Sequence, residues 1–179
     1  MSGMTSDSSP TVHGHVVSAL LPEGWTQVKP DNPAASQSQG NDSAIDCIAA
    51  QTQNSRDGVY APNLVVTVAS VPTDLGDLEW RDTTTHALID EIPGFVLLDL
   101  SEVATQKWKG FARLGCYILD DESITIRQFT WLDPDQPRGY TATLSCATRD
   151  YGAHYELFEN VGASLEAMPA APTDHSREG

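Results

Sequence analysis

The side chains best suited to acid–base or metal chemistry are two groups of carboxylates in the second half of the chain. Asp120, Asp121 and Glu122 are consecutive, and Asp133 and Asp135 flank a proline. Such groups can bind Ca²⁺ or act as general acids and bases. Both groups, however, separate apolar runs where the chain must turn, and turns favour Asp. The first group also lacks the glycine-spaced ligand series of a calcium loop, so we predict turns here.

The histidines do not complete a site. His13 and His15 are two residues apart and would share one face of a strand, but no third metal ligand is near them in the sequence. No recognisable motif links His86 or His154 to a nucleophile, and residues 144–146 lack the glycines of a nucleophile elbow. The glycine-rich motifs of nucleotide-binding loops are also missing. The sequence therefore predicts no catalytic residue, no cofactor site and no metal site.

Three cysteines, Cys47, Cys116 and Cys146, cannot all pair within one molecule, and their spacing fits no zinc motif. Cys116 and Cys146 fall in the first and third strands of a predicted meander. Neighbouring strands are ~4.8 Å apart, so two strands that flank a third are too distant for a disulfide. We predict small buried thiols.

The net charge is strongly negative, with 25 acidic and 10 basic residues among 179, which gives −15. This balance excludes nucleic acid as a partner, because binding to phosphates needs clustered Lys and Arg. An anionic membrane surface would also repel the chain. The excess acid has two interpretations: it serves solubility, or it forms a docking surface for a basic partner.

The chain has no run of ~18 apolar residues that could span a membrane. Its N-terminus has neither the basic nor the apolar region of a secretory signal, and no cysteine near the start could carry a lipid. The expected location is therefore cytoplasmic.

The region 108–148 organises the predicted fold. Three β-rich runs, at 108–119, 123–132 and 140–148, are separated by two clusters of turn residues, which predicts an antiparallel meander. Earlier strands are predicted at 15–21, 43–53, 63–71 and 95–100. Trp25 follows a Pro/Gly turn and is expected in the core.

Two helices complete the prediction. The first spans 77–92, is capped by Asp77 or Asp74, and would bury a stripe made of Leu78, Leu88, Ile89 and Ile92. The second spans 151–168 after a cap at Asp150, with apolar positions at Tyr155, Phe158, Val161, Leu165 and Met168. The fold class is α+β: an antiparallel sheet of about six to seven strands with a C-terminal meander and helices packed on it. We expect one domain over 12–168, with disordered segments at 1–11 and 169–179.

A candidate partner surface comes from residues that interrupt the apolar pattern. Trp80 lies off the stripe of the first helix beside charged residues, where an exposed indole could anchor a partner, although packing is the alternative. Arg127 alternates with apolar residues in the middle meander strand. With Thr125 and Gln128 it predicts a partly wet sheet face that could hold a ligand or partner.

The sequence resembles the LpqN/LpqT-type proteins of actinobacteria, within the PsbP-like superfamily that also includes DcrB-related proteins. The resemblance rests on LLPEGW, NLVVTVASV, EIPGFVLLD, WKGFARLGCYIL, SITIRQFTW, GYTATLSCAT and ASLEAM, which together extend from Val16 to Met168. It implies an antiparallel sheet sandwiched by helices and a non-enzymatic accessory or binding role. It supplies no catalytic residues.

Two functions are expected on this basis. The first is a protein–protein interaction or chaperone-like module with an unidentified protein partner, self-association into a homodimer being a further option. The second is a carrier of a small lipophilic ligand or metabolite, with a pocket between sheet and helix closed by the loop 29–42. An enzyme is the third choice.

Overall fold

The computed structural model describes residues 10–29, 43–53 and 59–168. Its elements in chain order are β1 (Thr11–His13), β2 (Val17–Leu20), β3 (Trp25–Val28), β4 (Ser43–Gln51), β5 (Asn63–Ser70), α1 (Asp77–Glu91), β6 (Val96–Ala104), β7 (Lys109–Leu119), β8 (Glu122–Leu132), β9 (Arg138–Ala147), the 3₁₀ turn η2 (Thr148–Asp150), α2 (Tyr151–Ser164) and β10 (Glu166–Ala167). Except for Lys29, the loop expected at 29–42 lies outside the described residues, and so do 1–9 and 169–179 of the terminal segments. Thr11, expected in the disordered N-terminal segment, pairs with Leu20 in a strand.

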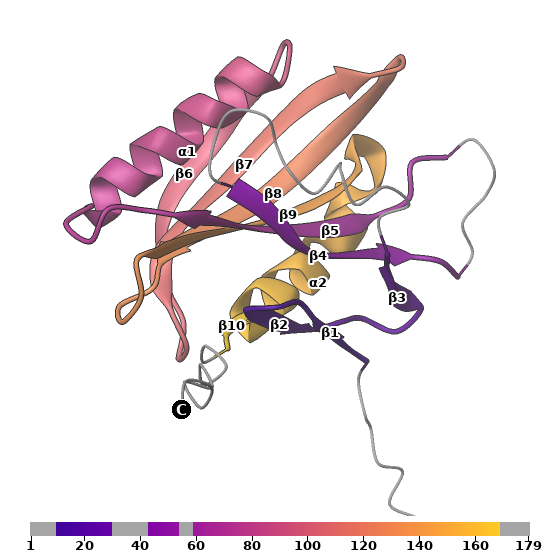
Figure 1. Ribbon diagram of the computed structural model, residues 1–179. Helices are drawn as coiled ribbons and strands as arrows, with labels where there is room; N and C mark the ends of the chain where they lie inside the picture. The colour runs from indigo at the N-terminus through magenta and orange to yellow at the C-terminus, as the bar shows by residue number, and fades with distance from the viewer. Residues whose placement is uncertain (1–9, 30–42, 54–58, 169–179) are drawn as a thin grey trace, which may run out of the picture.

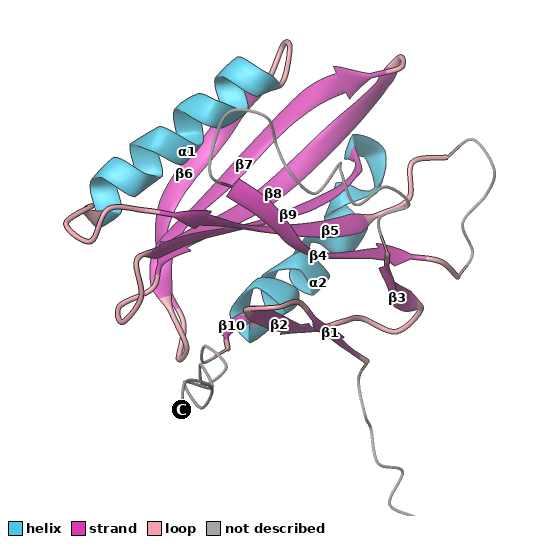
Figure 2. Cartoon of the chain, viewed as in Figure 1, coloured by secondary structure: helices cyan, strands magenta, loops and turns pink. Residues whose placement is uncertain are grey.

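The main sheet has seven strands in the order β3-β4-β5-β9-β8-β7-β6, and every neighbouring pair is antiparallel. The strands β7, β8 and β9 form the predicted meander, and β6 extends it to the edge (Figure 2). The α+β class with an antiparallel sheet and a C-terminal meander is therefore confirmed.

A second sheet of three strands, in the order β1-β2-β10, was not predicted. Its strands are two to four residues long, too short for a periodic pattern, and β10 comes from residues expected to continue the last helix. The strand predicted at 15–21 is thus shorter and belongs to this small sheet, while β3, also not predicted, forms one edge of the main sheet.

The main sheet separates two layers. In Figure 1, α1 lies along one face of β6, β7 and β8, while α2 and the small sheet lie on the opposite face. Successive side chains of a strand point to opposite faces, and β8 shows this directly. Ile124 and Ile126 pack with Leu88 of α1, whereas Phe129 and Trp131 join the large core beneath α2.

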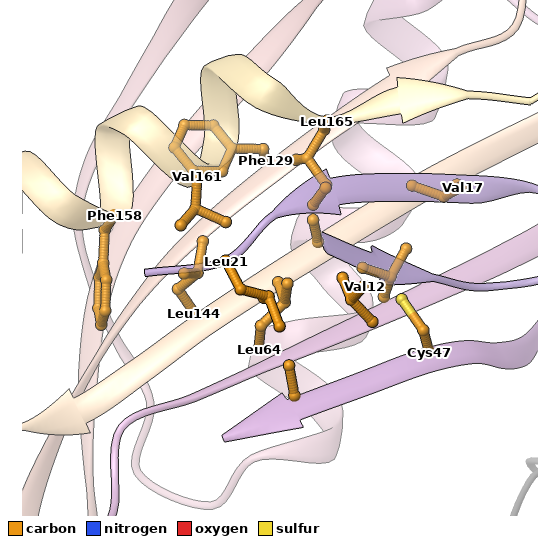
Figure 3. Packing of buried hydrophobic residues seen from close by; sticks show 14 of the residues in the cluster. Val12, Val17, Leu21, Cys47, Leu64, Phe129, Leu144, Phe158, Val161 and Leu165 are labelled. Atoms are coloured by element: carbon orange, nitrogen blue, oxygen red, sulfur yellow. The ribbon is translucent and has the colours of Figure 1, made fainter. Parts of the chain in front are cut away.

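The large core fills the space between the main sheet, α2 and the small sheet. Figure 3 shows Phe158, Val161 and Leu165 pointing from the α2 region toward side chains of both sheets. Trp25 is buried in this core, as predicted. Burial of each large apolar side chain contributes about 1.5–3 kcal/mol, so this layer is the main source of stability.

The predicted apolar stripe of α1 is wrong in part. Leu78 and Ile89 are exposed, and the buried residues are Leu88 and Trp80. The reason is that α1 rests on a partly polar sheet face, where an apolar stripe would not be satisfied. The helix also begins after Gly76 without a side-chain cap, so neither Asp74 nor Asp77 serves as the cap.

The last helix differs from its prediction in similar ways. Phe158 and Val161 are buried as expected, but Tyr155 is about half exposed. The helix ends at Ser164, and Leu165 reaches the core from just beyond it. Asp150 precedes the helix but makes no capping hydrogen bond with its side chain.

Candidate functional site

The predicted partner surface on β8 does not exist as a surface. Thr125, Arg127 and Gln128 are all buried. Gln128 points toward α1, while Thr125 and Arg127 lie on the α2 side, because neighbouring residues of a strand face opposite ways. The polar side chains that suggested a wet face form hydrogen bonds inside the protein, because β8 is a central strand covered on both sides.

Trp80 is also not a partner anchor, since only 7% of it is exposed. Its indole packs on the backbone of Gly139 in β9, where a Cβ would collide with the ring. The packing alternative for this residue is therefore correct. Its indole nitrogen is buried without a hydrogen-bond partner among the described residues.

The most polar buried position is one the sequence analysis missed. Arg113 of β7 is completely buried beneath α1. Its guanidinium donates to the hydroxyl of Thr85 at 2.7 Å and to the side-chain oxygen of Gln128 at 2.9 Å. Further hydrogen bonds reach the Thr84 hydroxyl and the Arg81 carbonyl. Burial, and secondarily the charge of Arg81, lowers the pKa of Arg113 to about 10.

This network continues across the sheet, because Gln128 donates to the Thr143 hydroxyl at 2.9 Å. Arg113, Gln128 and Thr143 are directly opposite one another on β7, β8 and β9. Aligning the three meander strands from their turns would have revealed this polar row in the sequence. The row holds no carboxylate, and its donors are engaged with α1 and the sheet. Its visible role is to position α1.

A second polar contact joins α2 to the sheet. Arg127 forms an ion pair with Glu159 of α2 at 2.7 Å, and its guanidinium is 4.0 Å from Asp99 of β6. A buried or half-buried ion pair of this kind fixes the placement of the helix. It also brings one cation between two carboxylates near the β6 edge.

The carboxylate clusters are turns, as predicted. Asp120 and Asp121 both have positive φ, 46° and 68°, between the paired residues Leu119 and Glu122, which is the pattern of a two-residue hairpin turn. Asp133 accepts hydrogen bonds from two backbone amides of its own turn and from the Tyr140 hydroxyl. Within the described ranges, no three His, Cys, Asp or Glu side chains gather as metal ligands.

All three cysteines are free. Cys47 and Cys146 are buried as predicted, and burial raises the pKa of each thiol to about 12. Cys116 is only half-buried, which corrects the expectation that all three are core residues. A buried thiol with a raised pKa is a poor nucleophile.

The space expected to form a carrier pocket is filled. Phe129 packs against Gly162 so closely that a Cβ on the glycine would overlap its ring, and the Trp108 indole donates to the Gly162 carbonyl at 3.2 Å. Two cavities in the described part of the chain lie elsewhere: one of about 180 Å³ between the segments 71–75 and 132–138, and one of about 370 Å³ beside residues 120–123 and Arg149. The first is smaller than the ~300–1,000 Å³ typical of sites for drug-sized ligands, and the second is lined by polar and charged side chains, so neither suits a lipophilic ligand.

The accessible feature that remains is the β6 edge, defined as strand Val96–Ala104 at the end of the main sheet. Its apolar side chains are exposed: Leu98 to 59%, Val96 to 51% and Leu100 to 37%. An edge strand presents unpaired backbone donors and acceptors on its outer side. The apolar residues at 95–100 predicted a strand, but the sequence could not show that this strand lies at an edge of the sheet.

The sequence matches no protein-family model and no curated protein. Its fold is nevertheless similar to solved structures at low identity. LpqN of Mycobacterium tuberculosis, described as involved in cell envelope biogenesis, is 14% identical with a TM-score of 0.62, over 92% of this chain and 88% of that one. The PsbP protein CyanoP of Synechocystis sp. PCC 6803 is 16% identical with a TM-score of 0.59, over 94% and 98%.

The Saccharomyces cerevisiae Ran-binding protein Mog1p is 8% identical with a TM-score of 0.53, over 88% of this chain and 94% of that one. These proteins differ in the roles that their descriptions give, so the likeness shows the fold and not the role. In the part of the chain that the structure describes, no helix is long and apolar enough to cross a membrane. The chain has the α+β fold shared by PsbP and Mog1 proteins.

Proposed function

We propose that this chain is a non-enzymatic protein-binding module that engages its partner along the β6 edge, and that it is related to the LpqN/LpqT-type proteins it resembles. The observation that carries the proposal is the exposure of Val96, Leu98 and Leu100 on an edge strand. Addition of a strand to an open sheet edge is a recurring mode of peptide recognition. A protein-binding member of the same fold, Mog1p, is consistent with it.

The packing supports this function over the carrier. The interior on the α2 side is occupied by aromatic residues, with Trp108 stacked on Trp131 at 5.0 Å between ring centroids. The polar residues on the α1 side are paired with one another. Among the residues that the structure describes, neither side forms the apolar chamber that a lipophilic ligand requires.

Site-specific photocrosslinking tests the proposal. A benzophenone amino acid would replace Leu98 in one variant and Val28 of β3, at the opposite edge of the sheet, in the matched control. Both variants would be expressed and irradiated in the cells that naturally make the protein. The proposal expects one discrete protein adduct at position 98 and none at 28. A lipid or metabolite adduct, identified by mass spectrometry, would favour the carrier, and equal adducts at both positions would contradict the β6 edge.

A further inference from the structure

We propose that the occupant of the β6 edge is an extended basic segment in which Lys or Arg alternates with apolar residues, added as an eighth strand along Asp99–Ala104. This inference rests on the proposed function and assigns the chemistry of the partner. It follows from three properties of the edge: its pairing, its exposed side chains and its charge.

The pairing leaves this strand open on one side. Within the described residues, β6 pairs only with β7. A bulge between Leu97 and Asp99 interrupts the register, and from Asp99 to Ala104 the pairing with β7 is regular. Natural edges are protected by charged side chains, Pro or bulges; β6 has a bulge before Asp99 and two acids, but neither Lys nor Pro. The six residues after the bulge are therefore a suitable template for another strand.

The opposite edge is a weaker template. Strand β3 has four residues against nine in β6. The side chain of Gln27 in β3 also donates to the His13 carbonyl at 2.9 Å, which ties this edge to the small sheet. The two edges thus differ in length and in accessibility, and β6 is the one available for docking.

The side chains of β6 carry an acid on each face of the sheet. Asp99 is opposite Leu114 and Glu102 is opposite Phe111. Leu114 and Phe111 are an odd number of positions apart on β7, and side chains alternate between the two faces of a sheet, so the two acids project toward different faces. Leu100 lies between them. An added strand would meet a carboxylate on either face and an exposed apolar side chain beside it. Opposite charges on neighbouring strands stabilise the pairing of the two strands.

The two acids of β6 differ in how nearby cations balance them. On one face, Arg127 is shared by Glu159 and Asp99. On the other, Arg81 pairs with Asp82 at 2.7 Å, and this hydrogen bond, together with the charges of Asp82 and Glu102, raises the pKa of Arg81. Two carboxylates around Arg127 leave one negative charge on the α2 face, which suits a basic side chain. On the α1 face, Arg81 and Arg113 offset the charges of Asp82 and Glu102, and the acid offered to an added strand is the exposed Glu102 carboxylate itself.

The same charge argues against a second copy as the occupant. Two copies paired through β6 would bring like charges together, and each chain carries a net charge of −15. Like charges on adjacent strands are destabilising. The lysines near the far end of β6 do not change this, because Lys109 pairs with Asp77 at 3.5 Å and Lys107 pairs with Glu166 at 2.6 Å.

The test uses three fluorescein-labelled octapeptides and fluorescence anisotropy with the full chain. One alternates Lys and Val, one alternates Glu and Val, and one has the sequence of the first with two of its valines replaced by proline. We expect the Lys/Val peptide to bind, and to bind at least tenfold more weakly at 300 mM than at 50 mM salt. We expect Leu100→Pro and Glu102→Lys to weaken it at least tenfold, and Val28→Lys to leave it unchanged. Val28 and Leu100 are equally exposed, at 38% and 37%, so they make a matched pair.

Each other result overturns a defined part of the proposal. Equal binding of the proline peptide would exclude strand addition. Equal binding of the Glu/Val peptide, still lost in Leu100→Pro, would overturn the basic assignment while the proposed function survives. Loss of peptide binding in Val28→Lys would show that the peptide docks at the β3 edge and not at the β6 edge. A dimer in sedimentation that Leu98→Lys dissociates would identify a second copy as the occupant. Thermal melts of every variant confirm folding, and Leu100→Lys, which keeps the backbone donors, replaces Leu100→Pro if the latter fails to fold.

Discussion

The guanidinium of Arg113 donates a hydrogen bond to the side-chain oxygen of Gln128 at 2.9 Å, and all its hydrogen bonds go to neutral groups, although the Asp82 carboxylate acts on its charge from a greater distance. The contact links β7 to β8 and, through Thr84 and Thr85, fastens α1 to the sheet. An unpaired buried charge is costly unless its donors are satisfied. This network explains why a helix with few buried apolar residues keeps its place.

We therefore expect Arg113→Ala to lower the free energy of unfolding by about 3 kcal/mol or more, because it leaves buried polar partners without a donor and opens a cavity. Arg113→Met should cost less, since it fills the space without a charge. Lys109→Ala is the control on the same strand, with a lysine side chain that is 80% exposed. Urea unfolding measures all three, and an Arg113→Ala value equal to that of the control would contradict the role given to the network.

Asp46 holds the small sheet against the main one. Its carboxylate accepts hydrogen bonds from the backbone amides of His15, Val16 and Val17 at 2.8, 3.1 and 3.0 Å. Gly14 is needed for this approach, because a Cβ there would overlap the carboxylate. We expect Asp46→Ala to cost ~1–3 kcal/mol and Gly14→Ala to reduce stability by the same route.

In a double-mutant cycle, the two substitutions should be strongly non-additive, because each removes the same contact. The control is Asp90→Ala, at an exposed position of α1. Simple additivity of the two losses would show that the carboxylate and the glycine act independently.

The thiols should differ in reactivity. Burial raises the pKa of Cys47 and Cys146 to about 12, so both remain protonated and shielded near pH 8. Cys116 is more accessible. With Ellman's reagent at pH 8, we expect Cys116 to react first in the native protein and all three to react in urea. The variant Cys116→Ser should lose the fast phase; if the fast phase persisted, the burial of the other two thiols would be in doubt.

Alkaline pH should weaken the fold through Tyr140. Burial, followed by the hydrogen bond to Asp133 and its charge, raises the pKa of the phenol to about 12 from 10.0. Between these values the unfolded chain binds fewer protons than the folded one, so stability falls as pH rises. Tyr140→Phe should lessen that fall, whereas Tyr155→Phe, at an exposed position, should not.

The lowered pKa of Arg113 makes stability rise with pH above about pH 10, opposite to the effect of Tyr140. The informative quantity is therefore the difference in free energy of unfolding between each variant and its parent. Unfolding in urea at pH 9 and pH 11 supplies it. An identical pH dependence in Tyr140→Phe and the parent would show that this phenol is not the group responsible.

The fold was predictable where alternation and turn chemistry agree. The meander follows from β-rich runs separated by Asp and Pro clusters, and Phe158 and Val161 follow from helical spacing. The small sheet was not predictable, because β2 pairs with β10 across nearly the whole chain and each strand is very short. Leu78 is exposed against expectation, and Trp80 is buried because its ring packs on Gly139 of β9, a contact between residues far apart in the sequence.

The candidate site was predicted at the wrong place for a related reason. Polar residues such as Arg127 and Gln128 suggest solvent when the strand order is unknown, yet they are satisfied inside the protein. Leu98 and Leu100 suggest a buried strand, yet they lie on an edge. Sequence periodicity indicates which residues share a face, but exposure depends on which strand is outermost.

The most direct test of the central claim is hydrogen exchange of the backbone amides with and without the alternating Lys/Val peptide, followed by mass spectrometry or NMR. The account predicts slower exchange within Asp99–Ala104 of β6, because new interstrand hydrogen bonds protect edge amides, and unchanged exchange in β3. Protection confined to β3 or α1, or no protection at saturating peptide, would contradict docking at the β6 edge.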